Sequence, residues 1–194
     1  MNRLISQLLV KGFPSVRQMQ FVPWRHVADW RCTTCGECCR LYSVVLNFHE
    51  WLKIVKGYGF EQTVSGLNKL FIKRKGDGSC AFLCSFSNVN VCGLQYMKPK
   101  ACKLWPFKVL AEPKYGFANE AAYRRGANTV FVYADSMCNG VKYGTPSWEF
   151  ANNTLKEFVE IAMGLGQTQH RTTSKIGFLY PYSAVRTHSS GLHF

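Results

Sequence analysis

The chain contains one short stretch, Cys-Thr-Thr-Cys-Gly-Glu-Cys-Cys, in which four thiols fall within eight residues. A Cys-x-x-Cys turn points two sulfurs at one centre, and this spacing occurs twice, between Cys32 and Cys35 and between Cys35 and Cys38. Gly36 lets the second turn take a positive φ. Adjacent side chains diverge, so Cys38 and Cys39 would strain to share one small ion. The stretch therefore predicts a second site or a larger cluster.

Five more cysteines lie further along the chain. Cys80, Cys92, Cys102 and Cys138 come singly from separated loops, and Cys84 follows Cys80 by four residues. These dispersed thiols are further candidate metal ligands.

The spacing of the cysteines also bears on which metal they bind. The spacing of the first three cysteines is typical of runs that hold iron–sulfur clusters, in which a fourth ligand comes from elsewhere in the chain. Zinc tolerates the same geometry, but four-cysteine zinc sites usually pair two knuckles, and this chain has one well-spaced set. The dispersed thiols therefore favour an iron–sulfur cluster, of the 4Fe–4S type, over zinc. Structural disulfides with buried free cysteines are a less favoured alternative, since Cys-x-x-Cys repeats in reducing compartments usually bind metal.

Composition limits the class of protein. At 194 residues, of which 47% are apolar, the chain fits one globular domain with a substantial core. No run of eighteen apolar residues occurs, so no membrane-spanning segment is expected. The nine cysteines are an odd number and no secretion signal is visible, which predicts a cytoplasmic protein. Residues 1–29 predict an amphipathic segment docked on the domain, although their basic composition can mimic a mitochondrial presequence.

The charge is strongly basic, because Lys and Arg outnumber Asp and Glu by 24 to 11, for a formal net charge of +13. This motivates an alternative function, a zinc-stabilised nucleic-acid-binding module. Four lysines cluster near the cysteines in sequence: Lys98, Lys100, Lys103 and Lys108. They can equally stabilise thiolates, since a nearby cation favours the ionised thiol. No recognisable nucleic-acid fold signature supports the alternative.

Short elements are predicted to carry the first cysteines. Residues 41–46 alternate and include β-branched side chains, which predicts a strand. Asn47 predicts the cap of a helix over residues 48–56, and apolar positions at helical spacing predict a second helix over residues 60–72. Residues 73–78, Lys-Arg-Lys-Gly-Asp-Gly, predict a solvated charged turn that returns the chain to the next cysteine.

The second half of the chain predicts more regular elements. Residues 107–111 and 115–118 predict a β-hairpin, and residues 129–134 predict a further strand. The clearest helix is predicted over residues 146–162, with Thr145 as its cap and a glycine at its end.

Together these elements predict a small α+β fold, loop-rich and organised by metal as a single domain. We expect three parts: the N-terminal segment 1–29, a cysteine-cluster domain over 30–166 that includes the C-terminal helix, and a tail over 167–194 that is partly docked through a strand at 176–180.

In order and spacing, eight of the nine cysteines resemble the YkgJ-type cysteine-cluster family, a zinc- or iron-chelating domain, over roughly residues 30–140. The shared pattern is Cys-x2-Cys-x2-Cys-Cys, a Cys-Ala-Phe-Leu segment, two cysteines separated by nine residues with Pro-Phe shortly after the second, and a late cysteine. Lys98 stands where the family usually has Arg. The resemblance implies that eight cysteines bind metal: Cys32, Cys35, Cys38, Cys39, Cys80, Cys92, Cys102 and Cys138. We expect these candidate ligands to bind metal in two groups of four, with Cys38 and Cys39 in different groups. Cys84 matches no position of the pattern, and we expect it to be a buried thiol rather than a spare ligand, because free cysteine is commonly buried. One relative, the flagellin lysine methylase, implies that such a module can belong to a protein-modifying enzyme.

The sequence thus predicts a metal-binding cysteine-cluster protein, with a redox or protein-modifying role and an unidentified protein or redox partner. A stand-alone methyltransferase is disfavoured, because no Gly-x-Gly follows a predicted strand and opens a helix. A nucleophilic Cys–His pair is also unsupported, since His26 and His49 are lone histidines, which are more often structural.

Overall fold

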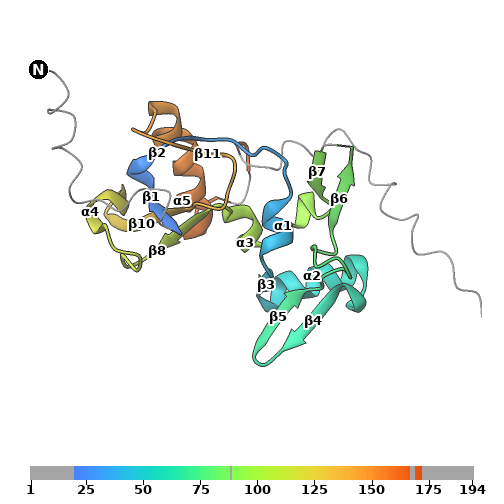
Figure 1. The fold of residues 1–194 in the computed structure, drawn as a ribbon. Coiled ribbons are helices and arrows are strands. Elements are labelled where there is room, and N and C mark those ends of the chain that lie inside the picture. The colour runs from blue at the N-terminus through green and yellow to red at the C-terminus, as the bar shows by residue number, and fades with distance from the viewer. Residues whose placement is uncertain (1–19, 88, 167–168, 172–194) are drawn as a thin grey trace, which may run out of the picture.

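The computed structural model describes residues 20–87, 89–166 and 169–171, and within them the chain forms five α-helices and eleven strands. These elements confirm a small α+β fold. They gather into two lobes, which we call the sheet lobe (residues 20–31 and 105–166) and the hairpin lobe (residues 42–87 and 89–97) (Figure 1). Between the lobes lie two short helices, α1 (Glu37–Leu41) and α3 (Lys100–Leu104).

The sheet lobe is built around β10 (Asn128–Asp135), whose run of β-branched and aromatic residues favours an extended chain. This strand confirms the one predicted over 129–134. It pairs antiparallel with three others: β1 (Phe21–Pro23), β8 (Phe107–Leu110) and β9 (Ala122–Arg125). A separate two-stranded ribbon pairs β2 (Val27–Trp30) with β11 (Val141–Tyr143). The segment 21–30 thus contributes one strand, β1, to the first sheet and the next strand, β2, to the ribbon.

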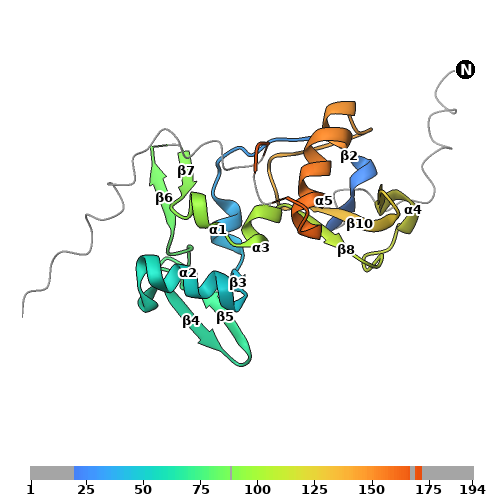
Figure 2. The same ribbon diagram turned by 180° about the vertical axis from the view of Figure 1, so that it is seen from behind.

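The helix α5 (Leu155–Met163) packs on the sheet lobe and is seen from behind in Figure 2. A π-helical turn, Phe150–Thr154, precedes it, and Gly164 ends it at a φ of 77°. The helix predicted over 146–162 is therefore confirmed in position, and its glycine stop is confirmed too.

The predicted cap of that helix is wrong. The side chain of Ser147, rather than Thr145, accepts a hydrogen bond from the backbone N–H of Phe150 at 3.1 Å. The backbone N–H of Ser147 in turn donates to the carbonyl of Ala28 at 2.9 Å, which anchors the start of the helix to β2. The tertiary contact decides which of two capping residues is used.

The hairpin lobe contains α2 (Phe48–Tyr58) and a three-stranded antiparallel sheet in the order β3 (Val45–Leu46), β5 (Lys69–Ile72) and β4 (Thr63–Gly66). A second hairpin joins β6 (Leu83–Phe86) to β7 (Val89–Cys92). The predicted helix start at Asn47 is confirmed: Asn47 and Glu50 form a capping box, in which each side chain accepts from the backbone N–H of the other residue.

The helix predicted over 60–72 is wrong, because this segment forms the β4–β5 hairpin after one 3-10 turn, Phe60–Gln62. Asn68 takes a left-handed conformation with φ of 60°, which this residue tolerates and a helix interior does not. Val64 and Leu67 are two of the apolar residues at helical spacing, which a packed helix would bury, but they are 47% and 98% exposed. The helical spacing of their apolar side chains was coincidental.

Three other local predictions need correction. Residues 41–46 form a strand only at Val45–Leu46, because the backbone N–H groups of Cys39 and Arg40 donate to the carbonyl of Gly36 and close α1 first. Residues 115–118 form no strand, since the helix α4 (Ala118–Ala121) begins there. The charged turn is not merely solvated: the guanidinium of Arg74 donates to the carbonyls of Arg40 and Tyr42 and ties the turn to the end of α1.

Each lobe has its own hydrophobic core. Trp30, Phe107 and Phe158 lie at the centre of the sheet-lobe core, and their rings meet edge-on or tilted at 4.7–5.9 Å. The hairpin-lobe core contains Ile54 and Leu94. None of the helices in the described ranges is long and apolar enough to cross a membrane. The segment 1–19 and the strand predicted at 176–180 lie outside the described residues.

Candidate metal centre

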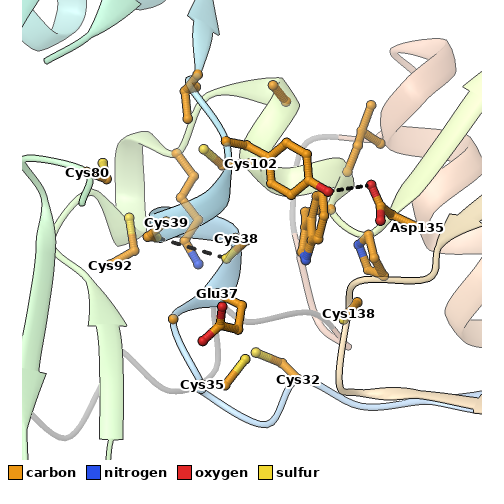
Figure 3. A pocket seen from close by; sticks show the side chains of 18 of the residues that line it. Cys32, Cys35, Glu37, Cys38, Cys39, Cys80, Cys92, Cys102, Asp135 and Cys138 are labelled. Carbon is orange, nitrogen blue, oxygen red and sulfur yellow. Dashed lines mark hydrogen bonds between the residues drawn. The ribbon is translucent and has the colours of Figure 1, made fainter. Parts of the chain in front are cut away.

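A cavity of about 420 Å³ lies between the two lobes, and all eight candidate ligands line it. Figure 3 shows their thiols around this cavity. They are Cys32, Cys35, Cys38, Cys39, Cys80, Cys92, Cys102 and Cys138. Cys84 on β6 does not line the cavity, and its Sγ lies 3.9 Å from the carbonyl oxygen of Phe82. The expectation that this thiol is buried is wrong, because Cys84 is only half-buried on its hairpin strand. The fold therefore gathers residues more than one hundred positions apart into one place.

Different elements deliver these thiols. Cys38 and Cys39 lie on α1, Cys102 on α3, and Cys92 ends β7, so two short helices and a hairpin present sulfur to the cavity. Cys80 is held in place through its backbone N–H, which donates to the carbonyl of Cys39 at 2.8 Å.

The loop that carries Cys35 is fixed from two sides. The guanidinium of Arg40 and the side-chain amide of Asn90 both donate to the carbonyl of Cys35, at 2.8 and 3.1 Å. Gly36 has the positive φ that the sequence predicted, 76°, and a Cβ there would meet the side chains of Arg40 and Asn90 at 2.8 and 2.9 Å. The second turn of the cysteine stretch therefore needs glycine.

The thiols fall into two sets. Cys32 and Cys138 pack against the sheet-lobe core, and we group them with Cys35 as set A. Cys39, Cys80 and Cys92 belong to the hairpin-lobe core, and we group them with Cys102 as set B. In Figure 3 the two sets lie at opposite ends of the cavity, and Cys38 lies between them.

The electrostatic influence of each thiol supports the same division. Negative charge on Cys35 raises the pKa of Cys138, and charge on Cys80 and Cys92 raises the pKa of Cys102, beyond the larger effect of burial on both. Negative charge on Cys38 raises the pKa of thiols in both sets, namely Cys32 and Cys138 in set A and Cys92 and Cys102 in set B. Cys38 is therefore close to both sets.

Burial is the main influence on the pKa of four of these thiols, and it disfavours the thiolate. It raises the pKa of Cys32 and of Cys92 to about 11, and it raises the pKa of Cys102 and of Cys138 as well. At Cys138 a hydrogen bond from the indole N–H of Trp30, 3.4 Å from Sγ, opposes the effect of burial. A metal ion that binds these thiols must displace their protons.

Three thiols share hydrogen bonds around Cys39. These bonds lower the pKa of Cys38 and of Cys80 and raise the pKa of Cys39, because Cys39 can donate to the two neighbours and stabilise their thiolates. The Sγ atoms of Cys38 and Cys39 are 4.0 Å apart. Two thiolates on one tetrahedral zinc ion would be about 3.8 Å apart. The distance between Cys38 and Cys39 alone therefore does not decide whether they bind the same ion or different ones.

The donor set fits a thiolate-bound metal. All candidate ligands that line the cavity are sulfur, which is the ligand that zinc and iron–sulfur clusters take in proteins. Within the described part of the chain, no three side chains of His, Cys, Asp or Glu stand close enough to hold one ion. Closing either set around a metal therefore needs side-chain movement.

Sequence reasoning missed two residues of the cavity wall, Tyr42 and Asp135. The hydroxyl of Tyr42 donates to Asp135 Oδ2 at 3.0 Å, and Asp135, only 1% exposed, also accepts from the backbone N–H of Met137 at 3.0 Å. Burial and then this hydrogen bond raise the pKa of Tyr42 to about 12. The one signal in the sequence was an acid at the end of an apolar strand, three residues before Cys138.

The four lysines near the cysteines have separate roles. Lys98 and Lys108 line the cavity, and the ammonium of Lys108 also lies 4.3 Å from the ring centre of Phe21. Lys100 instead joins the lobes, because its backbone N–H donates to Glu50 Oε1 at 2.7 Å and its ammonium donates to the carbonyl of Ala162 at 2.6 Å. Lys98 and Lys108 therefore lie at the cavity, whereas Lys100 contacts both lobes.

Comparison with known proteins gives one result. No curated protein and no solved structure matches the chain. One family model matches residues 31–139, which is more than half of the chain and includes all eight thiols of the cavity. By this match the chain belongs to the CxxCxxCC family, which is described as a "Putative zinc- or iron-chelating domain".

Proposed function

We propose that this protein binds metal at two four-thiol sites. Site A consists of set A and Cys38, so its ligands are Cys32, Cys35, Cys38 and Cys138. Site B is set B, so its ligands are Cys39, Cys80, Cys92 and Cys102. The observation that carries the proposal is that eight thiols from five separate segments line one cavity and divide between its two ends.

The assignment of Cys38 follows from number and position. Set B already has four thiols and set A has three, and Cys38 is close to both. Since a tetrahedral thiolate site needs four ligands, Cys38 completes site A. Cys39 shares hydrogen bonds with Cys80 and belongs to the hairpin-lobe core, so it stays in site B.

We favour iron–sulfur clusters over zinc at these sites, because single thiols from dispersed loops suit a larger cluster better than a single ion. A bound cluster would supply one-electron redox chemistry. The thiols of the two sites would hold it, and Trp30 is placed as a hydrogen-bond donor to Cys138 Sγ. A redox or protein-modifying role, exercised with a protein partner, is the function most consistent with such sites.

The test is metal and sulfide analysis of anaerobically purified protein, together with two single variants. We expect two centres per chain and a brown colour that bleaches on reduction. Cys138→Ser should lose the centre at site A and Cys92→Ser the centre at site B, so that each variant keeps about half of the metal. Cys84→Ser is the matched control and should keep both centres, because Cys84 does not line the cavity.

The outcomes separate the parts of the proposal. A metal content well below one centre per chain would reject metal binding altogether. Loss of all metal in both single variants would reject two independent sites. A colourless protein with two zinc ions would keep the sites and overturn the choice of iron.

A further inference from the structure

Lys98 is a buried cation in the wall of the cavity. Its side chain is only 6% exposed, whereas lysine is almost never fully buried unless its charge is balanced. It lies between η4 (Gln95–Met97) and Pro99, which begins the turn into α3. Because proline fixes its own φ and restricts the residue before it, this position holds the backbone of Lys98 in one extended conformation.

Lys98 lines the cavity that all eight thiols line, and the two sets of thiols lie at opposite ends of this cavity. Along the chain Lys98 lies between Cys92 and Cys102 of set B, and it shares the cavity wall with Cys32 and Cys138 of set A. One buried cation therefore faces a cavity that the thiols of both sets share.

Other cations near the cavity are placed differently. Lys108 also lines the cavity, but it is only half-buried, and its ammonium lies 4.3 Å from the ring centre of Phe21. Arg74 and Lys75 do not line the cavity; both are held by backbone carbonyls, Arg74 by that of Tyr42 at 2.7 Å and Lys75 by that of Leu83 at 2.7 Å. They are part of the hairpin lobe, whereas Lys98 stands in the connection between the lobes.

We propose that Lys98 is a positioning residue shared by the two sites, whose buried charge balances the thiolates of both and so sets the metal affinity and reduction potential of both centres. This inference rests on the proposed function, since it needs two loaded sites. Each site of four thiolates carries excess negative charge when it holds a metal, and a nearby cation stabilises the more negative state. For a redox centre that state is the reduced one.

The experiment compares the purified, metal-loaded wild type with two variants at position 98. Lys98→Met keeps much of the length of the side chain and removes the charge, and Lys98→Arg restores the charge. We expect Lys98→Met to lose metal to a chelator about ten- to a hundredfold more readily at both sites. If the centres contain iron, the midpoint potentials of both should become more negative. Lys98→Arg should return both quantities most of the way to wild type.

Lys56→Met is the matched control, because Lys56 is an exposed lysine on α2 that does not line the cavity. Should Lys98→Met fail to fold, Lys98→Gln removes the same charge with a polar side chain and is judged by the same measurements. Fully loaded Lys98 variants with unchanged affinity and potential, or with a change at one site alone, would overturn the shared role. A wild type without metal would instead reject the proposed function, so the two failures are distinguishable.

Discussion

The thiols of the cavity are not equivalent as acids, and this difference has a measurable consequence. Burial raises the pKa of Cys32 and Cys92 to about 11, so both keep their protons at neutral pH, while hydrogen bonds from Cys39 favour the thiolates of Cys38 and Cys80. Metal binding must therefore remove protons from Cys32 and Cys92, whereas Cys38 and Cys80 lose their protons more easily.

We therefore expect metal uptake to release protons and to tighten as the pH rises. A raised pKa means that protons compete with the metal at every pH below about 11, so the apparent affinity should increase between pH 6 and pH 8, by about tenfold per pH unit for each proton displaced. Titration of metal into the apo protein in buffers of different ionisation enthalpy gives the number of protons released. A pH-independent affinity with no proton release would contradict the burial of these thiols.

At the scale of elements, the close approach of two chain segments fixes where Cys32 and Cys138 lie. The carbonyl of Gly140 accepts a hydrogen bond from the backbone N–H of Arg31 at 3.2 Å, next to the β2–β11 ribbon. A Cβ at Gly140 would come within 2.1 Å of the carbonyl oxygen of Arg31. Since that contact is with backbone, the two segments would have to separate.

Gly140→Ala should lower the free energy of unfolding by roughly 1–3 kcal/mol, as overpacking in a tight site does. It should also weaken metal retention at site A, because the ribbon positions Cys32 and Cys138. Chemical denaturation of the loaded protein and metal analysis would measure the two effects. Gly76→Ala is the matched control, since a Cβ there meets nothing within 4 Å and the residue needs no positive φ. Equal behaviour of the two variants would show that the close approach has no energetic weight.

The same scale shows what the sequence could and could not predict. Local signals sufficed where an element is set by its own residues: the Asn47 cap predicts α2, and the apolar run of 129–134 predicts β10. They failed where a tertiary contact decides, as at the Ser147 cap, or where one residue in a left-handed conformation turns the chain, as at Asn68. A helical spacing of apolar residues does not exclude a hairpin.

The candidate site divides in a similar way. The resemblance to the cysteine-cluster family singled out the eight thiols that line the cavity and set Cys84 apart. It could not assign Cys80 or Cys138 to an end of the cavity, because that depends on which lobe each loop packs against. It also gave no reason to pair Tyr42 with Asp135, since these two residues lie 93 positions apart in the chain.

At the scale of the whole molecule, each proposed site lies mainly against one lobe. Cys32 and Cys138 of set A pack on the sheet-lobe core, and Cys39, Cys80 and Cys92 of set B pack on the hairpin-lobe core, so each metal would hold mainly one lobe together. In small metal-binding domains the free energy of metal binding is also free energy of folding. Loss of one metal should therefore loosen one lobe more than the other.

We expect Cys80→Ser to reduce the hydrogen-exchange protection of backbone amides in β4 and β5 more than in β10, and Cys138→Ser to do the reverse. Both comparisons use protein loaded with metal as far as each variant allows, with Cys84→Ser as the reference for a thiol outside the cavity. A uniform loss of protection over both lobes in either variant would show that the two lobes unfold as one unit and that the sites are not assigned to them.

The adjacent pair Cys38 and Cys39 on α1 also implies an order of events during synthesis. The ribosome releases the chain from its N-terminus, so the last ligand of site B, Cys102, emerges well before the last ligand of site A, Cys138. Site B can thus be filled while the sheet lobe is still incomplete. Its metal would fix Cys39, and with it the helical turn that holds Cys38. Three thiols of site A would then be present before the fourth, Cys138, is synthesised. The nascent hairpin lobe would then serve as the template on which the second centre is built.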